Sequence, residues 1–221
     1  MRGADKLTSW RDWLKRQPRW AWGVLFALLV LVVLDLAFPP PVPGRDAPNA
    51  LLIVARDGTP LRAFPDRDHA WRHPVALEDV SPLYLQALER YEDRWFRWHP
   101  GVNPLALTRA AWQWLRHGQI VSGGSTLTMQ VARIIEPTPR SLAGKGKQIL
   151  RALQLERRYS KDEILAIYVN YAPMGGVLEG IEAASRTYLG KPAKRLSHAD
   201  AALLTVLPQA PSRLRPDRQP A

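Results

Sequence analysis

The segment that decides the fold is Glu92–Gly101, EDRWFRWHPG, together with Gly123–Gln130, GGSTLTMQ. The first part places an acidic pair among bulky aromatic side chains, and the second is a glycine- and hydroxyl-rich turn that opens a helix. Backbone N–H groups at a helix start hold phosphate and sugar oxygens well. The two parts together predict a carboxylate site that faces a polar, oxygen-rich substrate, although N-capping alone also explains Ser125 and Thr126.

Composition limits the chain to one domain of ordinary size besides a membrane anchor. It has 221 residues, of which 46% are hydrophobic, which is enough for one core. Lys and Arg number 31 against 20 Asp and Glu, a net charge of +11. This excess suits an anionic partner such as lipid phosphate, nucleic acid or pyrophosphate, and charge does not choose among them. The chain has no cysteine, which excludes disulfides, a thiol nucleophile and a cysteine-based zinc site.

An apolar run covers residues 20–38, WAWGVLFALLVLVVLDLAF, with Asp35 as its single charge. At about 1.5 Å per residue it is long enough to cross a hydrocarbon core of about 30 Å. It predicts one transmembrane helix. A cleaved signal peptide is the alternative, and the length of the run and the lack of a small-residue cleavage pattern argue against it.

Basic residues before this run predict its orientation. Residues 1–19 carry six of them, whereas Arg45 is the only one between residues 39 and 50. Positively charged flanks of membrane helices stay in the cytoplasm. We therefore expect residues 1–19 to form a cytoplasmic basic tail and the chain after residue 38 to lie on the outer, periplasmic side of the inner membrane.

The rest of the chain divides into three parts. Residues 39–74 form a proline-rich spacer and a β-hairpin, because two short apolar stretches flank the turn formers Asp57-Gly58. Residues 75–210 form a mainly α domain, and residues 211–221, rich in proline and arginine, form a linker or a truncated end. Start and stop signals predict helices over residues 82–92, 104–117, 126–135, 144–158, 161–170 and 198–207.

Glu92 is the main candidate for acid–base chemistry. It closes the predicted helix 82–92, and the aromatic residues Trp95, Phe96 and Trp98 follow it. We expect these rings to enclose the carboxylate and make it a useful proton acceptor. Taken alone, a Glu-Asp pair at a helix end is usually solvated.

Three more side chains are candidates from their positions. Gln130 and Arg133 lie three positions apart, on one face of the predicted helix 126–135. An amide and a guanidinium placed there can hold a diphosphate or a carbonyl. His99 has no acidic residue close by in sequence to orient it, and we expect it to shape the loop through hydrogen bonds.

The pattern Glu-Asp-x-x-Phe-x-x-His-x-Gly, followed by GGST, resembles the first two motifs of the peptidoglycan glycosyltransferases of family 51. These are the polymerase modules of class A penicillin-binding proteins. The segments Lys161–Asn170 and Asp200–Leu204 match this family as well. The resemblance implies a mainly α, lysozyme-like glycosyltransferase domain, with Glu92 as general base and the loop of Ser125 and Thr126 on the donor side of the cleft.

The third family motif, an Arg-Lys pair followed after two residues by a glutamate, falls on Gly144, Lys145 and Gln148. The lysine is kept, but the arginine and the second carboxylate are not. An amide exchanges no proton and has no charge to bind a cation. Lys147 and Arg151 can restore positive charge near the leaving group, and a solvated basic helix face explains them equally well. This departure and the hairpin make the chain most similar to the 1C type.

The family normally continues into a transpeptidase domain. No serine here is followed three residues later by lysine, and no Lys-Thr-Gly triplet occurs, so we expect no transpeptidase activity. The resemblance instead implies a peptidoglycan glycosyltransferase that polymerises lipid II into glycan strands and releases undecaprenyl diphosphate.

The resemblance also implies the partners and the site. We expect lipid II, the growing glycan chain, membrane lipid and other cell-wall synthesis proteins as partners, and no nucleic acid. No metal ligands are predicted and no cofactor is required, although a divalent cation such as Mg²⁺ can assist at the diphosphate. Besides the catalytic Glu92, the expected substrate-binding residues are Asp93, His99, Ser125, Thr126, Gln130, Arg133, Lys145, Gln148 and Arg151.

Two other functions remain open at the level of sequence. One catalytic glutamate on a helical fold also suits a lysozyme-like enzyme that cleaves glycans. The missing carboxylate at Gln148 and the net charge of +11 also fit a catalytically silent membrane module that binds a cell-wall partner or anionic lipid. The segment 105–121 is amphipathic, and either enters the bilayer surface or packs as a core helix.

Overall fold

The chain divides into two compact units, residues 1–39 and 40–221. The structure, a computed structural model, describes residues 18–44, 50–56, 60–67, 69–118, 124–211 and 213–216. The first unit is known through one helix, and the second holds the remaining helices and all the described strands.

The helix of the first unit, α2 (Arg19–Ala37), has 19 residues and is about 28 Å long at 1.5 Å per residue. Its apolar part, Trp20–Ala37, is long enough and apolar enough to cross a membrane. The helix ends one residue before the predicted boundary because Phe38 precedes Pro39, and a residue before proline is disfavoured in the helical region. Its length matches a hydrocarbon core of about 30 Å.

The second unit begins with a small antiparallel hairpin of β1 (Leu51–Val54) and β2 (Pro60–Phe64). This confirms the predicted hairpin, while the predicted turn at Asp57-Gly58 lies outside the described residues. A second sheet has the order β3-β5-β4, from β3 (Trp71–Arg72), β4 (Pro173–Gly175) and β5 (Leu178–Glu179). These strands are two or three residues long, too short for an alternating pattern to predict them.

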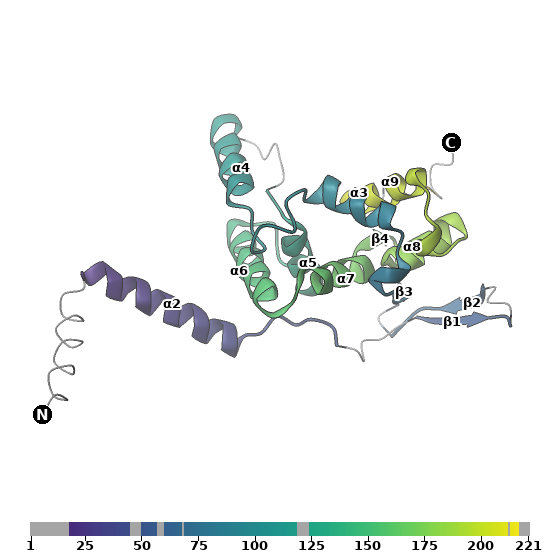
Figure 1. Cartoon of the computed structure of the whole chain (residues 1–221), viewed down its shortest axis with the longest axis horizontal. Coiled ribbons are helices and arrows are strands. Elements are labelled where there is room, and N and C mark those ends of the chain that lie inside the picture. Colours follow the sequence, from purple (N-terminus) through teal and green to yellow (C-terminus); the bar gives the residue numbers. More distant parts are fainter. Residues whose placement is uncertain are drawn as a thin grey trace, which may run out of the picture. The chain divides into compact units, whose positions relative to one another are not determined.

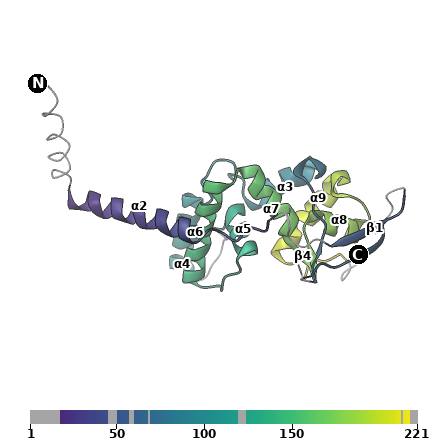
Figure 2. The same ribbon diagram turned by 90° about the horizontal axis from the view of Figure 1, so that it is seen from below.

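The helices of the second unit form its body. They are α3 (Pro82–Glu92), α4 (Pro104–His117), α5 (Leu127–Ile135), α6 (Leu142–Arg158), α7 (Lys161–Tyr171), α8 (Ile181–Leu189) and α9 (His198–Val206), with 3-10 turns at η1 (Leu77–Asp79), η2 (Ala193–Arg195) and η3 (Leu207–Gln209). Figure 2 shows α4, α5 and α6 at one end of this body, α8 and α9 at the other, and α7 between them. The mainly α class is therefore confirmed.

Local capping explains why most helix boundaries were predictable. Ser160 and Ser197 each form a capping box, and Thr126 accepts from the backbone of Met129. Helix α6 starts two residues earlier than predicted because the Ser141 side chain caps it. Helix α8 was not predicted. It begins after Gly180, which supplies no side-chain cap, so the usual start signal is missing.

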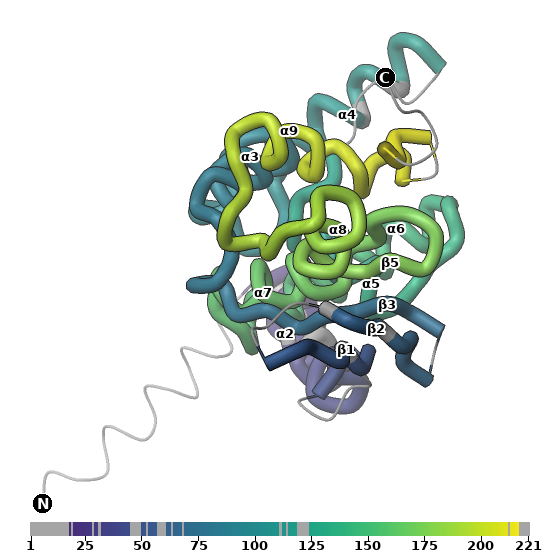
Figure 3. The backbone as a smooth tube through the Cα atoms, turned by 90° about the vertical axis from the view of Figure 1, so that its right-hand side faces the viewer, coloured from purple at the N-terminus to yellow at the C-terminus, as the bar shows by residue number. Residues whose placement is uncertain are grey.

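Helix α7 lies at the centre of the core. Its residues Ile164, Leu165, Tyr168 and Val169 are fully buried and pack with apolar residues of α3, α5, α6, α8 and α9. Removing this apolar surface from water is the main force that holds the helices together. Helices α3 and α9 lie side by side (Figures 1 and 3), which brings the 3-10 turn η3 toward the end of α3.

The segment after α9 also belongs to this body. Leu214 packs against the main core, and the Arg215 side chain lies against the backbone of Gly175 and Gly176. The packed part of the chain thus extends into the region predicted as a linker from residue 211.

Two glycines give a matched test of backbone strain. Gly180 has φ +81°, and a Cβ there would lie 2.6 Å from the Asn170 carbonyl oxygen, whereas Gly190 has φ +66° and open space around it. We expect Gly180→Ala to lower the free energy of unfolding by about 3 kcal/mol or more, and Gly190→Ala by about 1 kcal/mol. Urea denaturation of the detergent-solubilised chain, followed by tryptophan fluorescence, measures both. Equal losses would contradict the clash at Gly180.

Candidate active site

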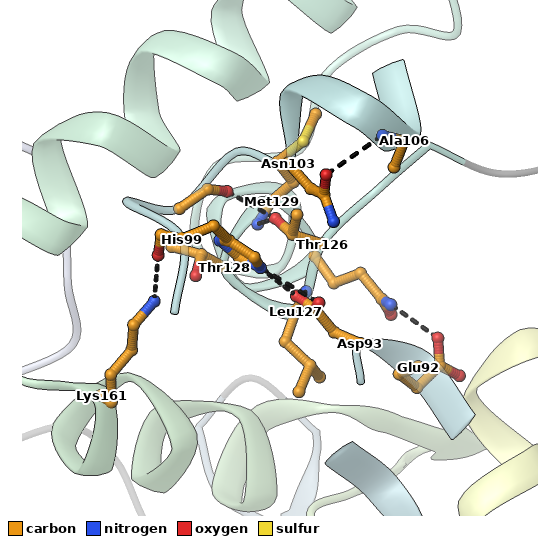
Figure 4. Close-up of polar contacts among 12 residues, drawn as sticks. Glu92, Asp93, His99, Asn103, Ala106, Thr126, Leu127, Thr128, Met129 and Lys161 are labelled. Carbon is orange, nitrogen blue, oxygen red and sulfur yellow. Dashed lines mark hydrogen bonds and ion pairs between the residues drawn. The ribbon is translucent and has the colours of Figure 1, made fainter. Parts of the chain in front are cut away.

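Glu92 is the last residue of α3, and two amides hold its carboxylate. Gln130 Nε2 of α5 donates to Oε2 at 2.7 Å, and Gln209 Nε2 of η3 donates to Oε1 at 3.2 Å. Figure 4 shows Glu92 at the end of its helix with the first of these bonds. The carboxylate is half-buried. The two amides are neutral donors, so they orient the Glu92 carboxylate without neutralising its negative charge in an ion pair.

The tryptophans near Glu92 do not enclose it. Trp95 and Trp98 are 53% and 83% exposed, and of the three expected aromatic residues only Phe96 is buried. The expectation of an aromatic cover is therefore wrong, because the turn after α3 directs Phe96 to the core and both tryptophans to the surface.

Two buried tyrosines lie near Glu92 instead. Burial, and then the negative charge of Glu92, raise the pKa of the Tyr84 hydroxyl. Burial also raises the pKa of Tyr168, with smaller contributions from Tyr84 and Glu92. Neither hydroxyl has a hydrogen-bond partner among the described residues. These rings come from α3 and α7, and no predicted site motif included them.

Asp93 joins the loop after α3 to the start of α5. Its carboxylate accepts from the Leu127 backbone N–H at 3.0 Å and contacts His99 Nε2 at 2.9 and 3.0 Å (Figure 4). Both side chains are buried. His99 therefore does have an acidic partner, in contrast to the expectation, and it lies six residues away. The geometry supports positioning roles for Asp93 and His99.

The Thr126 hydroxyl is also fully hydrogen-bonded to the backbone of its neighbours. Its hydroxyl accepts from the Met129 backbone at 3.1 Å and donates to the Gly101 carbonyl at 2.5 Å. Gly101 has φ +82°, and a Cβ there would lie 2.8 Å from the Ala152 carbonyl oxygen, so only glycine fits. The simple capping role is thus the one that the contacts of Thr126 support.

The basic side of the site is formed by Ser125, Arg133 and Lys145. Lys145 Nζ donates to Ser125 Oγ at 2.6 Å. Burial, and then the positive charge of Arg133, lower the pKa of Lys145. Arg133 is exposed and forms no hydrogen bond or ion pair within the described ranges. The positive charges of Arg133 and Lys145 are suited to an anionic group.

The remaining two predicted site residues are bonded to neighbours. Gln148 Nε2 donates to Thr138 Oγ1 at 2.9 Å. Arg151 donates to Glu136 at 2.6 Å and to Gln154 at 2.7 Å. Arg151 is therefore already paired, and its charge is offset by Glu136.

A polar network around Lys161 holds the loop between α3 and α4, and the sequence did not indicate it. Lys161 Nζ donates to the His99 carbonyl at 2.7 Å and to Glu156 at 2.6 Å, and Glu156 also accepts from Thr128 at 2.6 Å. Lys161 lies 4.6 Å from the centre of the Phe96 ring. In the sequence Lys161 marked a helix start and the beginning of a family motif, and neither indicated these contacts.

A cavity of about 430 Å³ adjoins this site. Gln130 and Arg133 of α5 line it together with Tyr168 of α7 and Pro208 of η3. Glu92 is therefore linked through Gln130 to a space large enough for part of a sugar or diphosphate ligand.

Comparison with known proteins identifies the class. Residues 57–221 match the transglycosylase family model, and the chain belongs to this family, which confirms the resemblance drawn from the sequence. It is 60% identical over 180 residues to penicillin-binding protein 1C of Escherichia coli (strain K12), covering 81% of this chain and 23% of that protein. It is 44% identical over 167 residues to penicillin-binding protein 1A of Pseudomonas aeruginosa, covering 75% of this chain and 20% of that protein.

A solved structure, penicillin-binding protein 1A from Haemophilus influenzae, aligns with 78% of this chain and 16% of its own, at 20% identity and a TM-score of 0.38. The chain spans less than a quarter of the length of each of the two penicillin-binding proteins compared above by sequence.

Asp93 offers a test of the site's framework. In Asp93→Ala the Leu127 N–H and the His99 ring lose a charged, buried partner, and we expect the free energy of unfolding to fall by about 3 kcal/mol. Asp162 pairs with Arg97 at 2.5 Å but is 69% exposed, so Asp162→Ala should change it by about 1 kcal/mol or less. Thermal unfolding of both variants measures the difference. A loss in Asp93→Ala no larger than in the control would refute the bridging role.

Proposed function

We propose that the chain polymerises lipid II into peptidoglycan glycan strands, with Glu92 as the general base. The observation that carries this proposal is the placement of Glu92, which is held by two amides, one of them from Gln130, and Gln130 lines a cavity together with Arg133. Membership of the transglycosylase family, and relatives named as penicillin-binding proteins, support it.

The reaction divides between the two sides of the site. Glu92 takes the proton from the 4-hydroxyl of the acceptor sugar, and the oxygen attacks the anomeric carbon of the growing chain. The bond from that carbon to the diphosphate breaks with inversion, and undecaprenyl diphosphate leaves with the bonding electrons. Arg133 and Lys145 stabilise the charge that develops on it. Ser125 holds Lys145 in place.

A magnesium ion does not fit the side chains around position 148. Magnesium prefers carboxylate oxygens and water as ligands. Gln148 offers an amide, and the Glu136 carboxylate is already paired with Lys147 and Arg151. The proposed mechanism therefore rests on the basic side chains and uses no step through a metal ion.

A lysozyme-like cleavage is less well supported. Glycosidases use a second carboxyl group across the bond to be broken. Asp93 follows Glu92 directly, but both of its carboxylate oxygens are already hydrogen-bonded to His99 and Leu127. Glu179 lines the same cavity but is paired with Arg72. Among these described carboxylates Glu92 is the one without an ion pair or a buried backbone partner, which suits transfer to a hydroxyl acceptor better than hydrolysis.

The catalytic role of Glu92 has a direct test. We expect Glu92→Gln to lower the rate of glycan polymerisation by about 10³-fold, the usual size of a lost general base, with little change in stability. Glu89→Gln is the control, because Glu89 is on the same helix and pairs with Arg97. Gel analysis of labelled lipid II consumption measures the rate. A Glu92→Gln enzyme within threefold of wild type, or release of fragments from finished glycan, would overturn the proposal.

The orientation of the membrane anchor is a further part of the proposal. With α2 as a retained span and six basic residues before it, the amino terminus stays in the cytoplasm and the catalytic unit lies in the periplasm. A reporter active only outside the cytoplasm, fused after Ala221, should be active. Replacing the basic residues of the tail by glutamine should reduce that activity. Reporter activity in the cytoplasm instead would contradict this topology.

A further inference from the structure

Glu136, which the proposed mechanism does not use, ties the end of α5 to the middle of α6. It is the residue that caps the carboxyl end of α5. Its carboxylate lies 2.7 Å from Lys147 Nζ and 2.6 Å from Arg151 Nε, both on α6. We call these three residues the Glu136 clasp. Hydrogen bonds from Lys147 and then Arg151 hold the pKa of Glu136 below its ordinary value, so the clasp is charged at neutral pH.

The clasp is partly shielded from water. The side chain of Glu136 is 25% exposed and that of Arg151 is 13% exposed. Ion pairs on an open surface contribute little, but a carboxylate that accepts from two cations in a half-buried place makes stronger, charge-assisted bonds. The clasp also joins two different helices, so it limits how they move relative to each other.

The clasp lies beside the position where the expected carboxylate is absent. Gln148 follows Lys147 directly on α6 and donates to Thr138, two residues after Glu136. An amide at this place offsets no positive charge. The carboxylate that offsets Lys147 and Arg151 comes instead from the end of the neighbouring helix.

Helices α5 and α6 also carry the two cations of the proposed diphosphate site. Arg133 stands three residues before Glu136 on α5, and Lys145 stands two residues before Lys147 on α6. Burial, and then the charge of Arg133, lower the pKa of Lys145. Like charges on two packed helices oppose their approach, and the clasp adds an attraction between the same two helices.

We propose that Glu136 is a positioning residue that keeps Arg133 and Lys145 close enough to bind one diphosphate group. It compensates for the missing carboxylate at position 148 by holding α5 against α6 and by keeping Lys147 and Arg151 away from the ligand. This inference rests on the proposed function for the identity of the anion. A small displacement of Arg133 or Lys145 should weaken diphosphate binding, because the group is held tightly only where both cations reach it.

The test uses the full chain and two readouts that need no catalysis. The variants are Glu136→Gln, Lys147→Glu and Lys147→Arg, the last of which keeps a cation beside Glu136. Asp79→Asn is the control, since Asp79 pairs with Lys194 on the surface at 2.6 Å. Calorimetry measures binding of inorganic pyrophosphate. Nuclear magnetic resonance of ¹³C-methylated lysines, assigned with Lys145→Arg, measures the pKa of Lys145.

We expect Glu136→Gln and Lys147→Glu to weaken pyrophosphate binding about five- to tenfold, the loss of roughly one charge-assisted contact. The pKa of Lys145 should change in Glu136→Gln, because the distance between Lys145 and the neighbouring cations changes. Lys147→Arg should bind within about twofold of wild type, and Asp79→Asn should match wild type. A role in stability alone would change the unfolding temperature but neither readout.

The inference fails if Glu136→Gln binds pyrophosphate as wild type does with an unchanged Lys145 pKa, or if Lys147→Arg weakens binding as much as Lys147→Glu does. It also fails if wild type binds no pyrophosphate. A wild-type chain that binds pyrophosphate but consumes no lipid II would overturn the proposed function and leave the clasp supported.

Discussion

The bridge from Asp93 to His99 and to the first backbone N–H of α5 is the interaction on which the rest of the site depends. A carboxylate at a helix start satisfies a backbone donor that has no partner within the helix and interacts favourably with the helix dipole. Because Glu92 precedes Asp93 directly, this bridge also fixes where α3 ends relative to α5. Gln130, one turn into α5, then reaches the Glu92 carboxylate at 2.7 Å.

The loop between α3 and α4 is held from a second side by α7. Lys161 binds the His99 carbonyl and Glu156, and its charge lies over the Phe96 ring. These contacts begin at the same residue that starts α7, whose apolar face fills the core. The site is therefore a continuation of the core packing. A mutation that displaces α7 would therefore also displace Glu92, because Lys161 links α7 to the loop that follows Glu92.

The site separates its charges by helix. The carboxylate of Glu92 is held by neutral amides, so its negative charge stays available for a proton. The cations of α5 and α6 lie on the other side, where Ser125 orients Lys145 and Glu136 binds Lys147 and Arg151. This separation suits a transfer reaction in which a proton is removed at one end and negative charge leaves at the other.

The sequence by itself determined the helices whose ends carry their own signals, and it determined the candidate base. Pro82 is the first residue of α3, Ser160 caps α7 and Gly118 follows α4, and such signals act over only three or four residues. The motif around Glu92 also identified the family. Only the tertiary structure decided that Gln209, 117 residues away, binds Glu92, that Trp95 and Trp98 lie at the surface, and that Glu136 offsets the charge near Gln148. These pairings join residues far apart in the chain, and the packing of helices around α7, rather than any local pattern, sets them.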